Sequence, residues 1–216
     1  MPKMLRKKIP GNHSKRHLQG MPQFRSINNR TNPSNAIGEI SMYGKMIKDL
    51  IKREGGYIDN PLDIGGPTKY GITQQTLTNY LGRHATAIDV KNLSKKTAAE
   101  IYEIYYYRKP NIDELPESLQ PVMLDMAANH GPRTAVKILQ KLLIDMDQDI
   151  RPDGLIGPHT LKSVDYIIYK RGIKYLCEML IKSRIAFYER IVKNDDTQRK
   201  FLPGWIRRAE SFLETA

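Results

Sequence analysis

The sequence predicts a mainly α-helical fold, and three observations support that prediction. Apolar residues recur with the helical period over several long segments, glycines and prolines stand where such segments end or begin, and the intervening stretches leave little room for strands. The 216 residues suffice for one sizeable domain or two small ones. The single cysteine, Cys177, can form no intramolecular disulfide, and its apolar neighbours predict a small buried side chain.

The first predicted element is a basic, extended or disordered arm over residues 1–40. It carries eight basic side chains and one acidic one, a net charge of +7 out of +12 for the whole chain, and it shows no apolar period. Such an arm could bind phosphates, an anionic wall polymer or an acidic groove on a partner protein, and composition does not choose among them. Nucleic acid is the least favoured partner, because Phe24 is the arm's only aromatic residue for base stacking.

No segment reaches the roughly 18 to 20 apolar residues that cross a membrane, so no membrane insertion is expected. The first residues are basic, but no apolar run and no small-residue cleavage site follows them, so no signal peptide is expected.

The next predicted elements are a helix and a loop. Apolar residues from Met42 to Ile51 follow the helical period, and Gly55 and Gly56 end the helix. A Gly/Pro-rich stretch over 55–73 allows turns and a short hairpin. Further helices are predicted from Ser94 to the break at Pro110, over 118–130, from Pro132, from Pro158, over about 172–193 and over about 204–214.

Glu54 falls at the end of the first predicted helix, on its apolar face, because it follows Ile51 by three residues and Leu50 by four. Burial raises the pKa of a carboxyl group, which is how an enzyme keeps a general acid protonated near neutral pH. A fraying helix end, with Glu54 in water, is the alternative. Two more carboxylates, Asp59 and Asp63, follow on the loop; such a pair suits glycoside hydrolysis, although the same residues are also ordinary turn formers.

Three segments of this region resemble the signature of glycoside hydrolase family 108, which contains bacterial and phage N-acetylmuramidases. They are Glu54 to Pro61, Asp63 to Thr68, and Tyr70 to Thr73. The C-terminal part resembles the predicted peptidoglycan-binding domain that accompanies this family. Four segments carry this resemblance: Leu124 to Gly131, Ala135 to Gln140, Asp153 to Thr160 and Phe201 to Arg208. It implies a lysozyme-like helical fold with a catalytic region over 41–112 and a helical peptidoglycan-binding region over 113–216.

The resemblance also implies the site residues. The glutamate of the Glu-Gly-Gly-Tyr motif is the family's catalytic residue, which corresponds to Glu54. A looser similarity to the phage lysozyme pattern adds Asp63 and Thr68, although the gap between these two is one residue shorter here, and Asp59 competes as second carboxylate. The expected substrate contacts are Tyr57, Asp59, Tyr70, Thr73 and Asn129. No metal and no cofactor is expected, and His130, where a small polar residue is usual, is expected to pack or to face the substrate groove.

The implied activity is hydrolysis of the β-1,4 bond between N-acetylmuramic acid and N-acetylglucosamine in peptidoglycan. Lytic transglycosylase action on the same bond and a non-catalytic, wall-binding virion component are the alternatives. We expect a phage-encoded protein, made in the host cytoplasm and delivered to the wall by a holin, a secretion route or a virion. Whether it acts at the end of infection or during wall penetration stays open.

Overall fold

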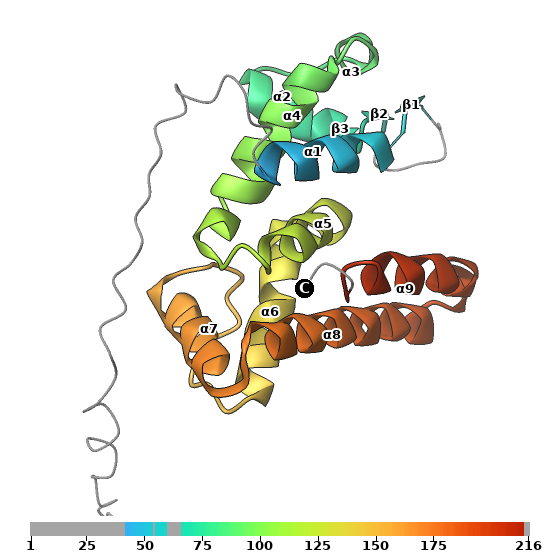
Figure 1. Cartoon of the computed structure of the whole chain (residues 1–216). Coiled ribbons are helices and arrows are strands. Elements are labelled where there is room, and N and C mark those ends of the chain that lie inside the picture. Colours follow the sequence, from blue (N-terminus) through green and yellow to red (C-terminus); the bar gives the residue numbers. More distant parts are fainter. Residues whose placement is uncertain (1–41, 54, 60–65, 214–216) are drawn as a thin grey trace, which may run out of the picture. The chain divides into compact units, whose positions relative to one another are not determined.

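The structure, a computed structural model, describes residues 42–53, 55–59 and 66–213, and these residues are mainly helical with one short sheet (Figure 1). The prediction of a mainly helical, lysozyme-like fold with a short hairpin is thus confirmed. The predicted arm over 1–40 lies outside the described residues. No helix within the described ranges is long and apolar enough to cross a membrane.

The first helix, α1 (Met42–Arg53), buries Ile47, Leu50 and Ile51, the apolar face that the sequence predicts. Gly55 has a φ of 77°, a left-handed conformation that glycine adopts readily at the end of a helix. Three short antiparallel strands follow, β1 (Tyr57–Ile58), β2 (Thr68–Lys69) and β3 (Ile72–Thr73), in the order β1-β2-β3.

Two short helices that the sequence analysis did not predict follow the sheet, α2 (Gln74–Leu81) and α3 (Ala87–Lys91). The side chain of Thr73 caps α2, and Thr86 forms a reciprocal capping box with Asp89 at the start of α3. These caps were readable in the sequence, but both helices are too short to show a strong apolar period.

The helix α4 (Lys95–Ile101) begins as predicted, because the Ser94 side chain accepts a hydrogen bond from the backbone N–H of Thr97 at 3.0 Å. It does not continue as an α-helix to Pro110. The chain widens into the π-helix η1 (Tyr102–Arg108) and then the 3₁₀ turn η2 (Ile112–Glu114). The wider turns allow Tyr102 and Tyr107, five residues apart, both to be buried.

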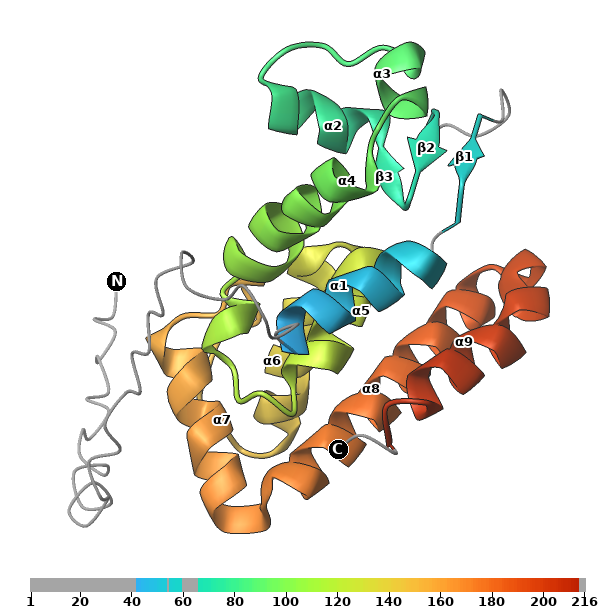
Figure 2. The ribbon, with the colours of Figure 1, turned by 45° about the horizontal axis from the view of Figure 1, so that its top comes forward.

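The C-terminal α-helices lie within a few residues of their predicted ranges, and a 3₁₀-helix that was not predicted precedes the last of them. They are α5 (Gln120–His130), α6 (Pro132–Asp145), α7 (Pro158–Arg171), α8 (Ile173–Asn194), the 3₁₀-helix η3 (Asp196–Phe201) and α9 (Leu202–Glu210). Helix α8 packs against α6, α7 and α9, and α5 packs against α6 (Figure 2). Cys177 is buried without a disulfide partner among the described residues, as predicted. One cluster of buried apolar side chains runs from α1 to α9.

Candidate active site

The predicted catalytic residues belong to the stretch of sequence that runs from the end of α1 to β2. Glu54 and Asp63 lie outside the described residues. In the chain, Glu54 directly follows the last residue of α1, and β1 begins three residues later. Thr68, the third predicted catalytic residue, is half-buried in the central strand β2.

The sheet brings together predicted site residues that are separated in the sequence. Thr68 lies opposite Ile58 of β1 and opposite Thr73 of β3, and Tyr57 lies opposite Lys69. Facing residues in antiparallel strands have Cβ atoms about 5 Å apart, so Thr68 and Thr73 are direct neighbours. The register therefore places Thr68 and Thr73 on one face of the sheet and Tyr57, with Lys69, on the other.

Asp59 and Tyr57 form a pair on β1 and just after it. The Tyr57 hydroxyl donates a hydrogen bond to Asp59 Oδ2 at 2.9 Å, and this bond raises the pKa of the tyrosine. Asp59 is exposed and Tyr57 is half-buried. The carboxylate of Asp59 thus fixes the direction of the Tyr57 hydroxyl, which suits contact with a sugar.

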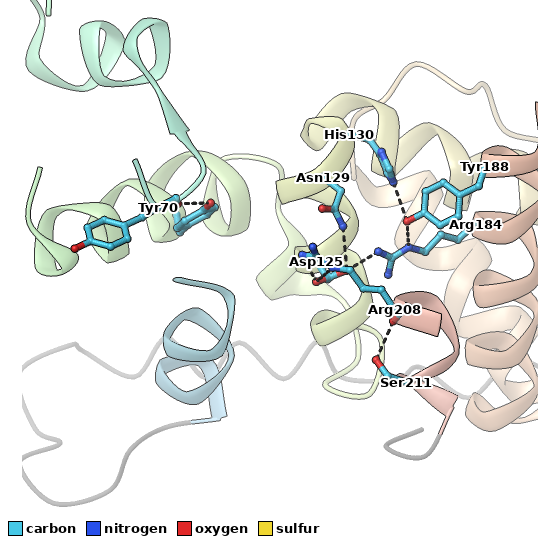
Figure 3. A network of polar contacts seen from close by, with 9 residues as sticks. Tyr70, Asp125, Asn129, His130, Arg184, Tyr188, Arg208 and Ser211 are labelled. Carbon is cyan, nitrogen blue, oxygen red and sulfur yellow. Dashed lines mark hydrogen bonds and ion pairs between the residues drawn. The ribbon is translucent and has the colours of Figure 1, made fainter. Parts of the chain in front are cut away.

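Tyr70 and Gly71 form the two-residue turn between β2 and β3. Both have positive φ, 54° and 74°, as in type I′ hairpin turns, and this conformation strains the tyrosine but not the glycine. The turn, which includes Tyr70 (Figure 3), is held by the buried Tyr102 of η1, whose hydroxyl donates to the carbonyl oxygen of Tyr70 at 2.9 Å. The Lys69 ammonium lies 5.2 Å from the centre of the Tyr70 ring.

Thr73 has a structural contact as well as a predicted site role. Its Oγ1 accepts a hydrogen bond from the backbone N–H of Thr76 at 3.2 Å and lies 3.0 Å from Thr76 Oγ1. The hydroxyl therefore caps α2 and fixes the junction between the sheet and that helix.

Asn129, the remaining predicted contact, lies on the last turn of α5 and not on the sheet. Its amide donates to Asp125 Oδ2 at 3.2 Å (Figure 3). Asp125 is buried and pairs with Arg184 of α8 and with Arg208 of α9, the latter at 2.9 Å. Asn129 thus belongs to a network that joins three helices.

The Asp125 network is not among the features that the sequence predicts. Both Asp125 and Arg208 lie inside segments that carry the family resemblance, 124–131 and 201–208, so their motif positions were the available signal. Arg184 is completely buried between the rings of Tyr188 and Phe212, with its guanidinium carbon 5.6 and 5.7 Å from their centres. A buried cation destabilises the folded chain unless a carboxylate pairs with it, so the burial of Arg184 requires Asp125.

His130 packs at the edge of this network. Its Nε2 lies 3.2 Å from the Tyr188 hydroxyl, which accepts a hydrogen bond from Arg184 Nε at 2.7 Å (Figure 3). Burial, together with the nearby charge of Arg184, lowers the pKa of His130 to about 4. The imidazole is therefore neutral at pH 7, and its Nε2 shares a hydrogen bond with the Tyr188 hydroxyl. The described residues contain no cluster of ligands that could hold a metal ion.

A separate cavity of about 400 Å³ lies between α1, α5 and the segment after α9. Its walls combine apolar side chains such as Met46, Leu50 and Phe212 with the carboxylates of Asp49 and Glu117. None of the six predicted site residues that the structure describes lines this cavity.

Comparisons with known proteins identify two family matches and a similar solved structure. The family described as "Glycosyl hydrolase 108" matches residues 47–131, and the family described as "Predicted Peptidoglycan domain" matches residues 134–210. Among solved structures, that of Brucella abortus SagA is similar, with a TM-score of 0.66 and 34% sequence identity over 80% of this chain and 91% of that chain. No curated protein matches. The first family match ends directly after α5, and the second begins at residue 134, in the first turn of α6.

Proposed function

The chain belongs to the glycosyl hydrolase 108 family, and we propose that it hydrolyses the β-1,4 bond between N-acetylmuramic acid and N-acetylglucosamine. It is a glycoside hydrolase with a peptidoglycan domain, and peptidoglycan is the polymer that it degrades. The observation that carries the finer proposal is the Glu54-Gly55-Gly56-Tyr57 segment, which joins α1 to β1 within the family match.

In this proposal Glu54 is the general acid. It donates a proton to the glycosidic oxygen as the bond to the anomeric carbon breaks, which lets the sugar leave as an alcohol. Its place in the Glu-Gly-Gly-Tyr motif, within the match to the glycosyl hydrolase 108 family, supports this role.

Asp63 is the proposed second carboxylate, assisted by Thr68. It either holds a water on the opposite face of the ring or stabilises the oxocarbenium-like transition state. The hydrogen bond between Tyr57 and Asp59 supports Asp63 over Asp59, since Asp59 already orients a tyrosine. NMR of the first product anomer, recorded before mutarotation, distinguishes an inverting from a retaining mechanism.

Tyr57, Asp59, Tyr70, Thr73 and Asn129 are the proposed substrate contacts. Tyr57 and Tyr70 offer aromatic faces for sugar rings beside the junction of α1 and β1. Thr73 and Asn129 also form hydrogen bonds within the protein, to Thr76 and Asp125 respectively. Besides contacting the substrate, they therefore stabilise the start of α2 and the end of α5.

Product analysis separates hydrolysis from lytic transglycosylase action. Purified peptidoglycan is digested, reduced with borohydride and analysed by mass spectrometry. The proposal predicts reduced muramic acid ends from the wild type. Products with 1,6-anhydro ends would transfer the assignment to a transglycosylase, and no cleavage at all would favour a wall-binding virion component.

We also propose a phage origin, with the chain acting in host wall lysis or wall penetration and reaching the wall through a holin, a secretion route or a virion. The net charge of +12 supports attraction to an anionic cell wall. Immunodetection in purified phage particles would favour a virion-borne enzyme, and detection only in lysates would favour release at the end of infection.

A further inference from the structure

Aromatic and basic side chains gather where α7 ends and α8 begins. Gly172, with a φ of 85°, makes the turn between the two helices. We name this region the α7–α8 corner, and its residues are Tyr166, Tyr169, Lys170, Arg171, Lys174 and Tyr175. Figures 1 and 2 both draw the corner away from the three-stranded sheet, so it is a different surface from the candidate active site.

The cations of the corner lie against the tyrosine rings. Lys170 Nζ is 5.7 Å from the centre of the Tyr166 ring and 5.6 Å from that of Tyr169. The guanidinium carbon of Arg171 is 5.8 Å from the centre of the Tyr175 ring. These distances are within the range of cation–π attraction, so each cation is held beside an aromatic face.

The corner is open to solvent. Tyr169 is 67% exposed and Tyr175 is 37% exposed, and Lys170, Arg171 and Lys174 are also exposed. An exposed tyrosine ring gains little hydrophobic free energy when the chain folds. A ligand that covers the ring removes its apolar surface from water, and this burial favours binding.

The charge of the corner is one-sided. Residues 162–175 contain four basic side chains and one acidic one. None of the three corner cations forms an ion pair with another described residue. The surface is therefore complementary to a ligand that carries both flat apolar faces and carboxylates.

We propose that the α7–α8 corner binds a peptidoglycan strand at a site separate from the catalytic one. The C–H faces of the sugar rings lie on Tyr169 and Tyr175, and the carboxylates of the stem peptides pair with Lys170, Arg171 and Lys174. The proposal rests on peptidoglycan being the substrate, as under the proposed function. Its support is the combination of exposed rings and cations within residues 134–210, the match to a predicted peptidoglycan domain.

Cosedimentation tests this site without requiring hydrolysis. The full chain carrying Glu54→Gln is mixed on ice with purified sacculi stripped of attached anionic polymers. Two further variants are made in that background, Tyr169→Ala/Tyr175→Ala and Lys170→Gln/Arg171→Gln. Each is expected to raise the Kd about tenfold, because each removes several partly desolvated contacts.

Matched variants control for charge and for exposed apolar area. Arg190→Gln/Lys193→Gln removes two exposed cations from the other end of α8, and Ile88→Ala in α3 removes an apolar side chain that is 69% exposed. Both should bind sacculi like the parent chain. The proposal is overturned if the tyrosine variant binds normally, or if the charge control weakens binding as much as Lys170→Gln/Arg171→Gln.

Turnover separates this proposal from the catalytic one. With Glu54 restored, the corner variants should lose activity on insoluble sacculi and keep wild-type activity on short soluble muropeptide chains. Equal losses on both substrates would contradict a separate binding site. An enzyme that cleaves neither substrate would count against the proposed function and leave the binding result intact.

Discussion

A single buried hydroxyl supports the strained turn of the sheet. Tyr102 donates to the carbonyl oxygen of Tyr70, whose positive φ is unfavourable for a tyrosine. Tyr102→Phe removes this bond and leaves the ring, so we expect the free energy of unfolding to fall by about 1 kcal/mol. If the turn aligns Thr68, kcat falls as well, with KM less affected.

Urea unfolding and steady-state kinetics measure both effects. Tyr80→Phe is the control, since it removes a hydroxyl that donates to Glu100 at 2.7 Å and lies outside the hairpin. Wild-type stability and kcat in Tyr102→Phe would show that the turn needs no such support.

The two candidate second carboxylates give different kinetic signatures. Asp63→Asn should lower kcat by about 10²- to 10⁴-fold, the usual range for loss of a catalytic proton-transfer group. Asp59→Asn removes only the acceptor that orients Tyr57, so it should act mainly on KM. The reverse pattern would identify Asp59 as the second carboxylate.

At the residue scale, the sequence predicted contacts that are local in the chain and missed those that are not. The motif around Glu54, Tyr57 and Asp59 is continuous, so the order of residues is enough to identify it. The partners of Asp125 are 59 and 83 residues away, at Arg184 and Arg208, and no local pattern links them. The roles of Glu54, Asp63 and Thr68 stay predictions.

At the scale of elements, long helices with clear ends were predictable and short ones were not. Gly131 and Pro132 mark the start of α6, and Gly157, Pro158 and Gly172 mark both ends of α7. The π-helix η1 was missed because local sequence favours a continuous α-helix, and burial of Tyr102 and Tyr107 is a tertiary effect. The boundary predicted at 112/113 stays a prediction.

The Asp125 network is the main polar link among α5, α8 and α9. Asp125→Ala leaves the guanidinium of Arg184 buried without its carboxylate, which should lower the free energy of unfolding by about 3 to 5 kcal/mol. Asp196→Ala is the control, because its ion pair with Arg199 is exposed and should matter little. Chemical denaturation measures the free energy of unfolding of both variants. Equal losses in the two would contradict the structural role assigned to Asp125.

At the scale of the whole molecule, His130 makes stability depend on pH. Burial and Arg184 lower its pKa to about 4 in the folded chain, with Arg208 acting in the same direction and Asp125 opposing, whereas the unfolded value is near 6.5. The unfolded chain therefore takes up the proton first, and stability present above pH 6.5 is lost as the pH falls towards 4.

Between pH 7.5 and 5.0 this histidine should lower the free energy of unfolding by about 1 to 2 kcal/mol. Urea midpoints of the wild type and of His130→Gln over this range measure the effect. The variant should show the smaller pH dependence, and parallel curves would contradict the assignment to His130.

The most direct test of catalysis by Glu54 is the rate of glycosidic cleavage of purified peptidoglycan by the wild type, Glu54→Gln and Glu210→Gln. Glu210 is exposed at the end of α9, so its variant controls for loss of one carboxylate. We expect wild-type release of reducing muramic acid ends by Glu210→Gln and at least about 10²-fold slower release by Glu54→Gln. Wild-type rates from a folded Glu54→Gln would contradict the proposed mechanism.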